Sequence, residues 1–165
     1  MKKAIALLCV ALVCGCEVKS GSTTPQGLVS VETSTPKDDG TFVIDNAGVL
    51  GDVTGLEKEL SQLNTAGTAQ LKVLVVDSLN GEDIEGFAQR IAHTWALGTA
   101  KKDNGVLIVL APNDRKVRVQ VGYGLEGTLT DQYCGEVSRQ ARTFFKNKDY
   151  LGGTNYMVHQ LVSRL

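Results

Sequence analysis

Four acidic residues stand where their carboxylates could act together as metal ligands. Asp45 follows a short apolar run, Asp103 precedes a long one, and Glu126 and Asp131 follow its alternating partner. Carboxylate oxygens with little histidine or thiol nearby suit Ca²⁺ or Mg²⁺ rather than a softer metal. The spacing fits no EF-hand loop. The alternative is structural: Asp131 caps a helix, Asp103 forms a turn, and the other two are solvated.

A second group of residues could hold a phosphate. Arg115 lies between Asp114 and Lys116 in a turn, and we treat its guanidinium as a possible phosphate clamp. A solvated hairpin tip explains this turn equally well. Sequence signatures of catalysis are sparse: there is no G-x-S-x-G elbow and no P-loop, so no catalytic residue is assigned.

The glycines of the 122–127 loop match a dinucleotide fingerprint, Gly122-x-Gly124-x-x-Gly127. The match is weak, because Glu126 would face a pyrophosphate with like charge and the loop does not open a first βαβ unit. We expect these glycines to relieve positive φ angles and to allow close packing.

The elements around these residues can be predicted from periodicity. Residues 106–111 are continuously apolar, and three valines alternate with polar residues over 117–121. The intervening Pro112-Asn113-Asp114 predicts a turn, so the two runs form an antiparallel hairpin. From Thr41 the pattern is β-α-β-α-β-β-α-α, with helices from apolar spacing of three and four residues. We therefore predict a single three-layer α/β/α domain over 41–165, with a mixed, mainly parallel sheet containing one antiparallel hairpin. The order of the strands cannot be predicted from this pattern.

The N-terminus predicts export and lipid attachment. Residues 1–15 have two lysines followed by a ten-residue apolar run, which is too short to span a bilayer. The run ends in Val13-Cys14-Gly15-Cys16, which resembles a lipobox, so Cys16 would carry the lipid; ordinary cleavage leaving Cys16 unmodified is the alternative. Residues 16–40 are rich in Ser and Thr, lack aromatics and are expected to form a flexible tether. Glu17 after the lipid-bearing cysteine favours the outer membrane facing the periplasm over the inner membrane.

The cysteine count argues against a disulfide-stabilised domain, and the net charge argues against a nucleic-acid-binding protein. With Cys9 and Cys14 in the signal and Cys16 acylated, Cys134 is alone, so we expect no intramolecular disulfide and a small, buried role for Cys134. The formal net charge of −1 gives no reason to expect nucleic acid as a partner.

From about Thr41 to its end, the chain resembles the TPM domain family. The resemblance rests on the order and spacing of five motifs: residues 43–50 (VIDNAGVL), 95–98 (WALG), 103–107 (DNGVL), 114–116 (DRK) and 121–131 (VGYGLEGTLTD). It implies a divalent cation bound by loop carboxylates at Asp45, Asp103 and Asp131. We expect this cation to be Ca²⁺ rather than Mg²⁺. We add Glu126 to this set because it is the one charged side chain of the glycine loop.

Two functions follow as expectations. The first is a lipid-anchored envelope module that binds or regulates membrane-protein partners, contacts membrane lipid through Cys16 and holds a divalent cation. The alternative, which rests on the resemblance, is a metal-assisted acid phosphatase. In that case the metal held by Asp45, Asp103 and Asp131 would activate water, with Arg115 as the phosphate clamp.

Overall fold

The computed structural model describes residues 35–165. The predicted signal segment 1–15, the lipid attachment at Cys16 and the tether up to residue 34 lie outside the described residues. Within residues 35–165, no helix is long and apolar enough to cross a membrane.

The described elements occur in the predicted order. They are β1 (Val43–Asp45), α1 (Thr54–Ala66), β2 (Gln70–Val75), α2 (Ile84–Thr94), β3 (Gly105–Ala111), β4 (Lys116–Val121), a 3₁₀ turn (Tyr123–Leu125), α3 (Asp131–Lys146) and α4 (Tyr150–Val162). The predicted α/β domain with one antiparallel hairpin is confirmed.

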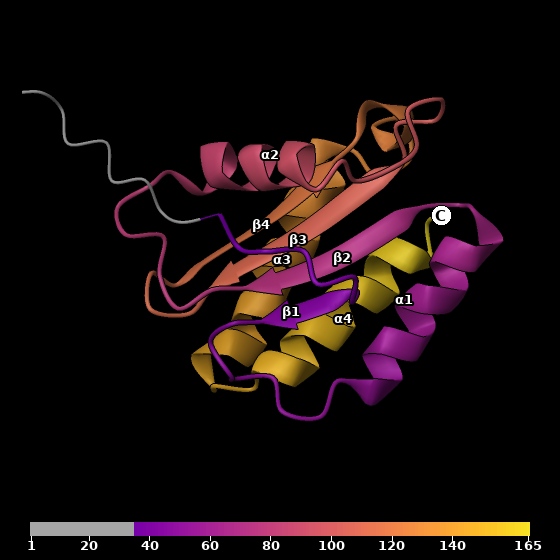
Figure 1. Cartoon of the computed structure of the whole chain (residues 1–165). Helices are drawn as coiled ribbons and strands as arrows, with labels where there is room; N and C mark the ends of the chain where they lie inside the picture. The colour runs from indigo at the N-terminus through magenta and orange to yellow at the C-terminus, as the bar shows by residue number, and fades with distance from the viewer. Residues whose placement is uncertain (1–34) are drawn as a thin grey trace, which may run out of the picture. The chain divides into compact units, whose positions relative to one another are not determined.

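The four strands form one sheet in the order β1-β2-β3-β4. β1, β2 and β3 are parallel, while β4 returns antiparallel to β3, with Ile108 opposite Val119. β1 and β4 are therefore the two edge strands, and Figure 1 shows them on opposite sides of the sheet.

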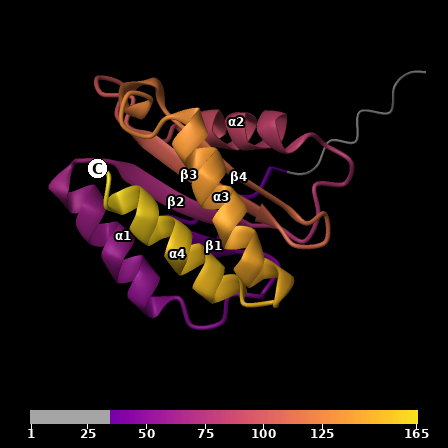
Figure 2. The same cartoon turned by 180° about the vertical axis from the view of Figure 1, so that it is seen from behind.

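Helices cover both faces of the sheet, which the alternating side chains divide between two cores. On one face, Val73 and Ile108 pack with residues of α1, α3 and α4. On the other, Leu74 and Leu107 pack under Phe87 of α2. Figure 2 shows α1, α3 and α4 together on one side and α2 behind the sheet. β3 is buried along its whole length, as its continuous apolar run predicts.

The start of α3 differs from the structural alternative considered for Asp131. Thr130 is the N-cap, and its hydroxyl accepts a hydrogen bond from the Tyr133 amide at 3.3 Å. Asp131 is the first helical residue, where its charge is favoured by the helix dipole. The Asp131 carboxylate is consequently not used as a cap.

The last residues of the predicted tether lie against the domain. Asp38 pairs with Lys72 of β2, and the carbonyl of Pro36 accepts a hydrogen bond from the Trp95 indole at 3.0 Å. Thr35 accepts a hydrogen bond from Arg90 of α2. Residues 35–38 thus belong structurally to the domain rather than to a free linker.

Candidate functional site

The predicted metal ligands are divided between the two ends of the strands. Asp45 ends β1, at the carboxyl ends of the parallel strands. Asp103 precedes β3 at the amino ends of these strands, and the antiparallel β4 delivers Glu126 and Asp131 to that same end. The seven residues of β3 separate the two ends by roughly 20 Å. The expected convergence of Asp45 with Asp103 and Asp131 therefore does not occur, because the sheet places β1 and β3 in parallel.

Asp45 organises its own loop. Its Oδ2 accepts a hydrogen bond from the Leu50 amide at 2.8 Å, which closes the 45–50 loop. Its Oδ1 is buried and has no hydrogen-bond partner among residues 35–165. A divalent cation needs several oxygen ligands. Asp45 has one free carboxylate oxygen and belongs to no group of candidate ligands within residues 35–165.

Asp103 joins the loop before β3 to the loop after β4. Its Oδ2 accepts a hydrogen bond from the Tyr123 amide at 3.1 Å, and its carbonyl accepts one from Gly124 at 3.0 Å. The backbone φ angle of Asp103 is 46°, in the left-handed region that aspartate tolerates better than most residues. This carboxylate has a structural role.

Two glycines of the 122–127 loop lie where its backbone comes close to the backbone of the loop before β3. A Cβ on Gly122 would lie 2.4 Å from the Asp103 carbonyl oxygen, and one on Gly124 would lie 1.8 Å from that of Lys102. Neither glycine has a positive φ angle, and Gly127 has open space around it. The expected close packing is confirmed for Gly122 and Gly124, whereas the expected relief of positive φ is wrong.

The WALG motif (95–98) and the DNGVL motif (103–107) also pack closely against each other at this end of the strands. A Cβ on Gly98 would lie 2.5 Å from the Gly105 amide nitrogen, and one on Gly105 would lie 2.5 Å from the Leu97 carbonyl oxygen. The buried Asn104 accepts a hydrogen bond from the Thr99 amide and donates one to the Thr68 carbonyl. These motif residues therefore build the loop cluster that supports the end of β4.

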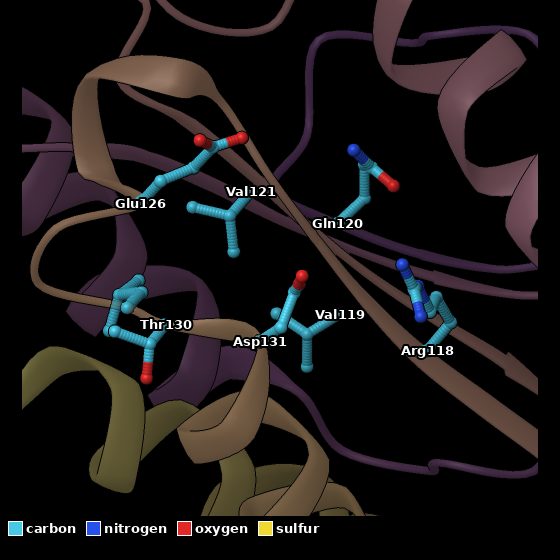
Figure 3. A pocket seen from close by; sticks show the side chains of 8 residues that line it. Arg118, Val119, Gln120, Val121, Glu126, Thr130 and Asp131 are labelled. Carbon is cyan, nitrogen blue, oxygen red and sulfur yellow. The ribbon is translucent and has the colours of Figure 1, made fainter.

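Glu126 and Asp131 share a pocket of about 370 Å³ beside β4. Arg118, Gln120 and Thr130 are also among its lining residues. Figure 3 shows the two carboxylates bordering the same hollow, with Arg118 at its other end. Of the four predicted ligands, these are the two that the structure brings to one pocket. No group of three or more His, Cys, Asp or Glu residues that could hold a metal occurs in the described part of the chain.

The pocket lies along an open sheet edge. The Gly122 amide donates a hydrogen bond to the Gly105 carbonyl at 2.7 Å. In an antiparallel pair every second residue bonds to the partner strand, so the residues of β4 that bond to β3 are Gln120, Arg118 and Lys116. Val117, Val119 and Val121 therefore turn their backbone N–H and C=O groups away from β3. No hydrogen bond joins these outward groups to other residues in 35–165. The edge can accept another strand.

The charge of Arg118 is already compensated. Its Nη1 donates to Glu85 of α2 at 2.8 Å. Its Nε is buried without a hydrogen-bond partner in the described range. Glu126 and Asp131 form no ion pair with any described residue, so the pocket presents a net negative charge.

Arg115 lies at the other end of β4 from this pocket. It occupies the turn that leads into Lys116, whereas Asp131 follows the loop after Val121. The predicted phosphatase arrangement required Arg115 near a metal held by Asp45, Asp103 and Asp131. Asp45 lies at the same end of the strands as Arg115, but Asp103 and Asp131 lie at the other end. The length of the strand separates the two groups, so the structure does not assemble that arrangement.

Cys134 is a core residue. Burial raises the pKa of its thiol to about 11, and the nearby negative charge of Asp131 adds to this rise. A thiol with this pKa is protonated at neutral pH and is a poor nucleophile. The predicted small, buried role is confirmed.

The fold is an α/β domain with an open edge strand, β4, supported at one end by the loops around Asp103. A family model described as the TPM domain matches residues 43–164. The chain therefore belongs to the TPM domain family. No curated protein matches it.

Three solved structures are similar to this chain. The N-terminal domain of a protein from P. gingivalis is 27% identical, with a TM-score of 0.70 over 76% of this chain and 82% of that one. The N-terminal domain of the cg2496 protein from Corynebacterium glutamicum is 18% identical, with a TM-score of 0.60 over 80% and 85% of the two chains. The BA42 protein from Bizionia argentinensis is 16% identical, with a TM-score of 0.50 over 69% and 83%. The last two likenesses concern the fold alone.

Proposed function

We propose that this TPM domain is a lipid-anchored binding module of the cell envelope that captures an extended segment of a membrane-protein partner at the open edge of β4. The observation that supports this proposal most strongly is the row of outward backbone groups at Val117, Val119 and Val121, beside an acidic pocket. A strand added there would gain main-chain hydrogen bonds from the edge and side-chain selectivity from the pocket.

The pocket defines the chemistry of the partner segment. Glu126 and Asp131 are acidic and unpaired, whereas Arg118 is neutralised by Glu85. A lysine or arginine on the added strand would therefore be attracted to this end of the edge. The proposed segment is extended and carries a basic side chain near the pocket.

A binding role is preferred over hydrolysis for a geometric reason. The carboxylates that the phosphatase alternative requires are split between the two ends of the strands. Arg115 lies at the end of β4 opposite to Asp103 and Asp131. Strand capture needs none of these residues to meet.

A divalent cation is the other proposed occupant of the pocket of Glu126 and Asp131, bound there in the absence of the partner and displaced by the partner's basic side chain. Two carboxylates with water completing the coordination suit Ca²⁺, which accepts flexible oxygen shells more readily than Mg²⁺ does. Asp45 and Asp103 are not ligands in this proposal, because each is engaged in its own loop.

Site-specific photo-crosslinking in envelopes tests the proposal. A photoreactive residue at Thr128, which is exposed beside the pocket, should crosslink to a membrane protein, whereas one at Lys58 on α1 should not. The Glu126→Gln variant should reduce the Thr128 crosslink, and Asp77→Asn, which removes an exposed charge elsewhere, should leave it unchanged. Equal crosslinking at Thr128 and Lys58 would contradict capture at β4.

The anchor is tested separately by fractionation. If Cys16 carries the lipid, Cys16→Ser should move the protein from the membrane to the soluble envelope fraction, because the ten-residue apolar run before Cys16 is too short to span a bilayer. Retention of this variant in membranes would refute attachment through Cys16.

A further inference from the structure

A second pocket lies at the opposite end of β4, where the β3–β4 turn meets the end of α3. Its volume is about 490 Å³, within the range of small-molecule sites. Five of its lining residues are basic: Arg115, Lys116, Arg142, Lys146 and Lys148. No acidic residue within 35–165 lines it.

These five cations come from three separate segments. Arg115 and Lys116 are at the β3–β4 turn, Arg142 and Lys146 lie one turn apart on α3, and Lys148 is in the α3–α4 connection. Like charges at i and i+4 repel each other on a helix. The dipole at the end of α3 favours Lys146 in the last turn, but does not account for the other four.

The cations are also unpaired. None of the five forms an ion pair or a side-chain hydrogen bond within residues 35–165. By contrast, every described arginine outside this pocket is engaged: Arg90, Arg118 and Arg139 form ion pairs, and Arg164 lies over the Tyr133 ring. The chain as a whole has a net charge of −1, so this patch does not reflect a generally basic protein.

The acidic residues that adjoin the cations in sequence are engaged elsewhere. Asp114, next to Arg115, accepts hydrogen bonds from the Leu79 amide and the Ser78 hydroxyl. Asp149, next to Lys148, caps α4 by accepting one from Gly152 at 2.9 Å. Both carboxylates are therefore engaged, and no other described residue compensates the positive charge of the pocket.

The wall between the cations is apolar. Phe145 and Tyr150 stack with ring centroids 6.2 Å apart, and Val117 also lines the pocket. The pocket therefore combines a cationic rim with an aromatic wall.

We infer that this pocket binds an organic phosphate, with the phosphoryl group at Arg115 and Arg142 and an apolar body against Phe145 and Tyr150. A guanidinium group can donate two parallel hydrogen bonds to the oxygens of one phosphate. The two arginines without another partner in residues 35–165 are therefore the main contacts. The phosphate can come from a soluble ester or from an anionic phospholipid headgroup. The site is for binding, and it requires no metal.

Phenyl phosphate is the probe for an NMR titration of the full chain. We expect it to shift the backbone amides of Arg115, Lys116, Lys146 and Lys148, and to bind more tightly than inorganic phosphate because of its ring. The Arg115→Gly/Arg142→Gln variant should bind phenyl phosphate at least about tenfold more weakly. Glycine suits position 115 because its φ angle is 55°.

A variant with the same change in net charge is the matched control. Lys58→Gln/Lys101→Gln removes two exposed, unpaired cations outside the pocket and should bind phenyl phosphate as the unchanged protein does. Equal loss of affinity in both double variants, or shifts not centred on the four named amides, would overturn the proposal.

Vesicles identify the source of the phosphate. If phosphatidylglycerol vesicles displace phenyl phosphate and phosphatidylcholine vesicles do not, the ligand is a lipid headgroup. If neither displaces it, the ligand is a soluble organic phosphate. Displacement by both vesicle types alike would indicate apolar adsorption and would contradict a phosphate site.

Discussion

The ammonium group of Lys72 lies 2.5 Å from the carboxylate of Asp38, and this ion pair fastens the residues before β1 to the sheet. Lys72 is buried in β2, with its Nζ 5.6 Å from the centre of the Trp95 ring. A buried lysine keeps its charge at low cost only when it has such partners. The domain therefore begins before Thr41.

Asp38→Asn should destabilise the domain, because it leaves the buried ammonium of Lys72 without a counter-charge. We expect a loss of about 2–3 kcal/mol in the free energy of unfolding, measured by urea denaturation. The neighbouring Asp39→Asn is the control: Asp39 accepts hydrogen bonds from Thr41 at the surface, and its substitution should cost less than about 0.5 kcal/mol. Equal effects of the two substitutions would mean that the ion pair adds nothing.

Gly124→Ala should disrupt the junction beside the acidic pocket. The new methyl group would lie 1.8 Å from the Lys102 carbonyl oxygen, so one of the two loops must move. We expect a destabilisation of at least about 2 kcal/mol by thermal or chemical denaturation. Gly127→Ala enters open space in the same loop and should be nearly neutral. Similar melting of the two variants would refute the close approach of the loops.

Cys134 predicts a loss of stability at alkaline pH. Its thiol titrates near 9.0 when unperturbed and near 11 in the fold, so above pH 9 the unfolded chain loses a proton that the folded chain keeps. The stabilisation is complete below pH 9 and is lost between pH 9 and 11, by up to about 2–3 kcal/mol. Cys134→Ala should show a smaller decline over this window in denaturation at stepped pH values. Parallel curves for the two proteins would exclude this contribution.

A divalent cation should bind at Glu126 and Asp131 and not at Asp45. Glu126→Gln preserves the side-chain shape but removes its charge, so Ca²⁺ affinity measured by calorimetry should fall roughly 10–100-fold. Asp45→Asn should leave the affinity unchanged, because Asp45 lies at the other edge of the sheet. Unfolding curves that superimpose with Ca²⁺ and with EDTA would exclude a structural cation.

The elements of this fold can be predicted from local sequence because their signals are local. The alternation at Val117, Val119 and Val121 is a property of one strand, and so is the apolar run of β3. The same signals could not predict that β4 is an open edge of the sheet. They show which face of β4 is buried but not whether a strand lies beyond it, since strand order depends on contacts between distant segments.

The separation of Asp45 from Asp131 was unpredictable for the same reason. Both follow a strand in sequence, but β1 and β4 run in opposite directions, so the residues after them emerge at opposite ends of the sheet's strands.

The two crossover connections between the parallel strands have different hands. β1 to β2 and β2 to β3 step in the same direction across the sheet, yet α1 and α2 cover opposite faces. The two crossovers must therefore have opposite hands, whereas a right-handed rule would place both helices on one face.

Amide hydrogen exchange along β4 tests strand capture most directly. The probe is a synthetic peptide that covers the partner segment crosslinked at Thr128. If this segment adds to the edge, the amides of Val117, Val119 and Val121 should exchange at least about tenfold more slowly, because they gain hydrogen bonds. The amides of Arg118 and Gln120 already bond to β3 and should change little. Protection of every second residue would support the account, whereas binding that leaves the three valine amides unprotected would contradict it.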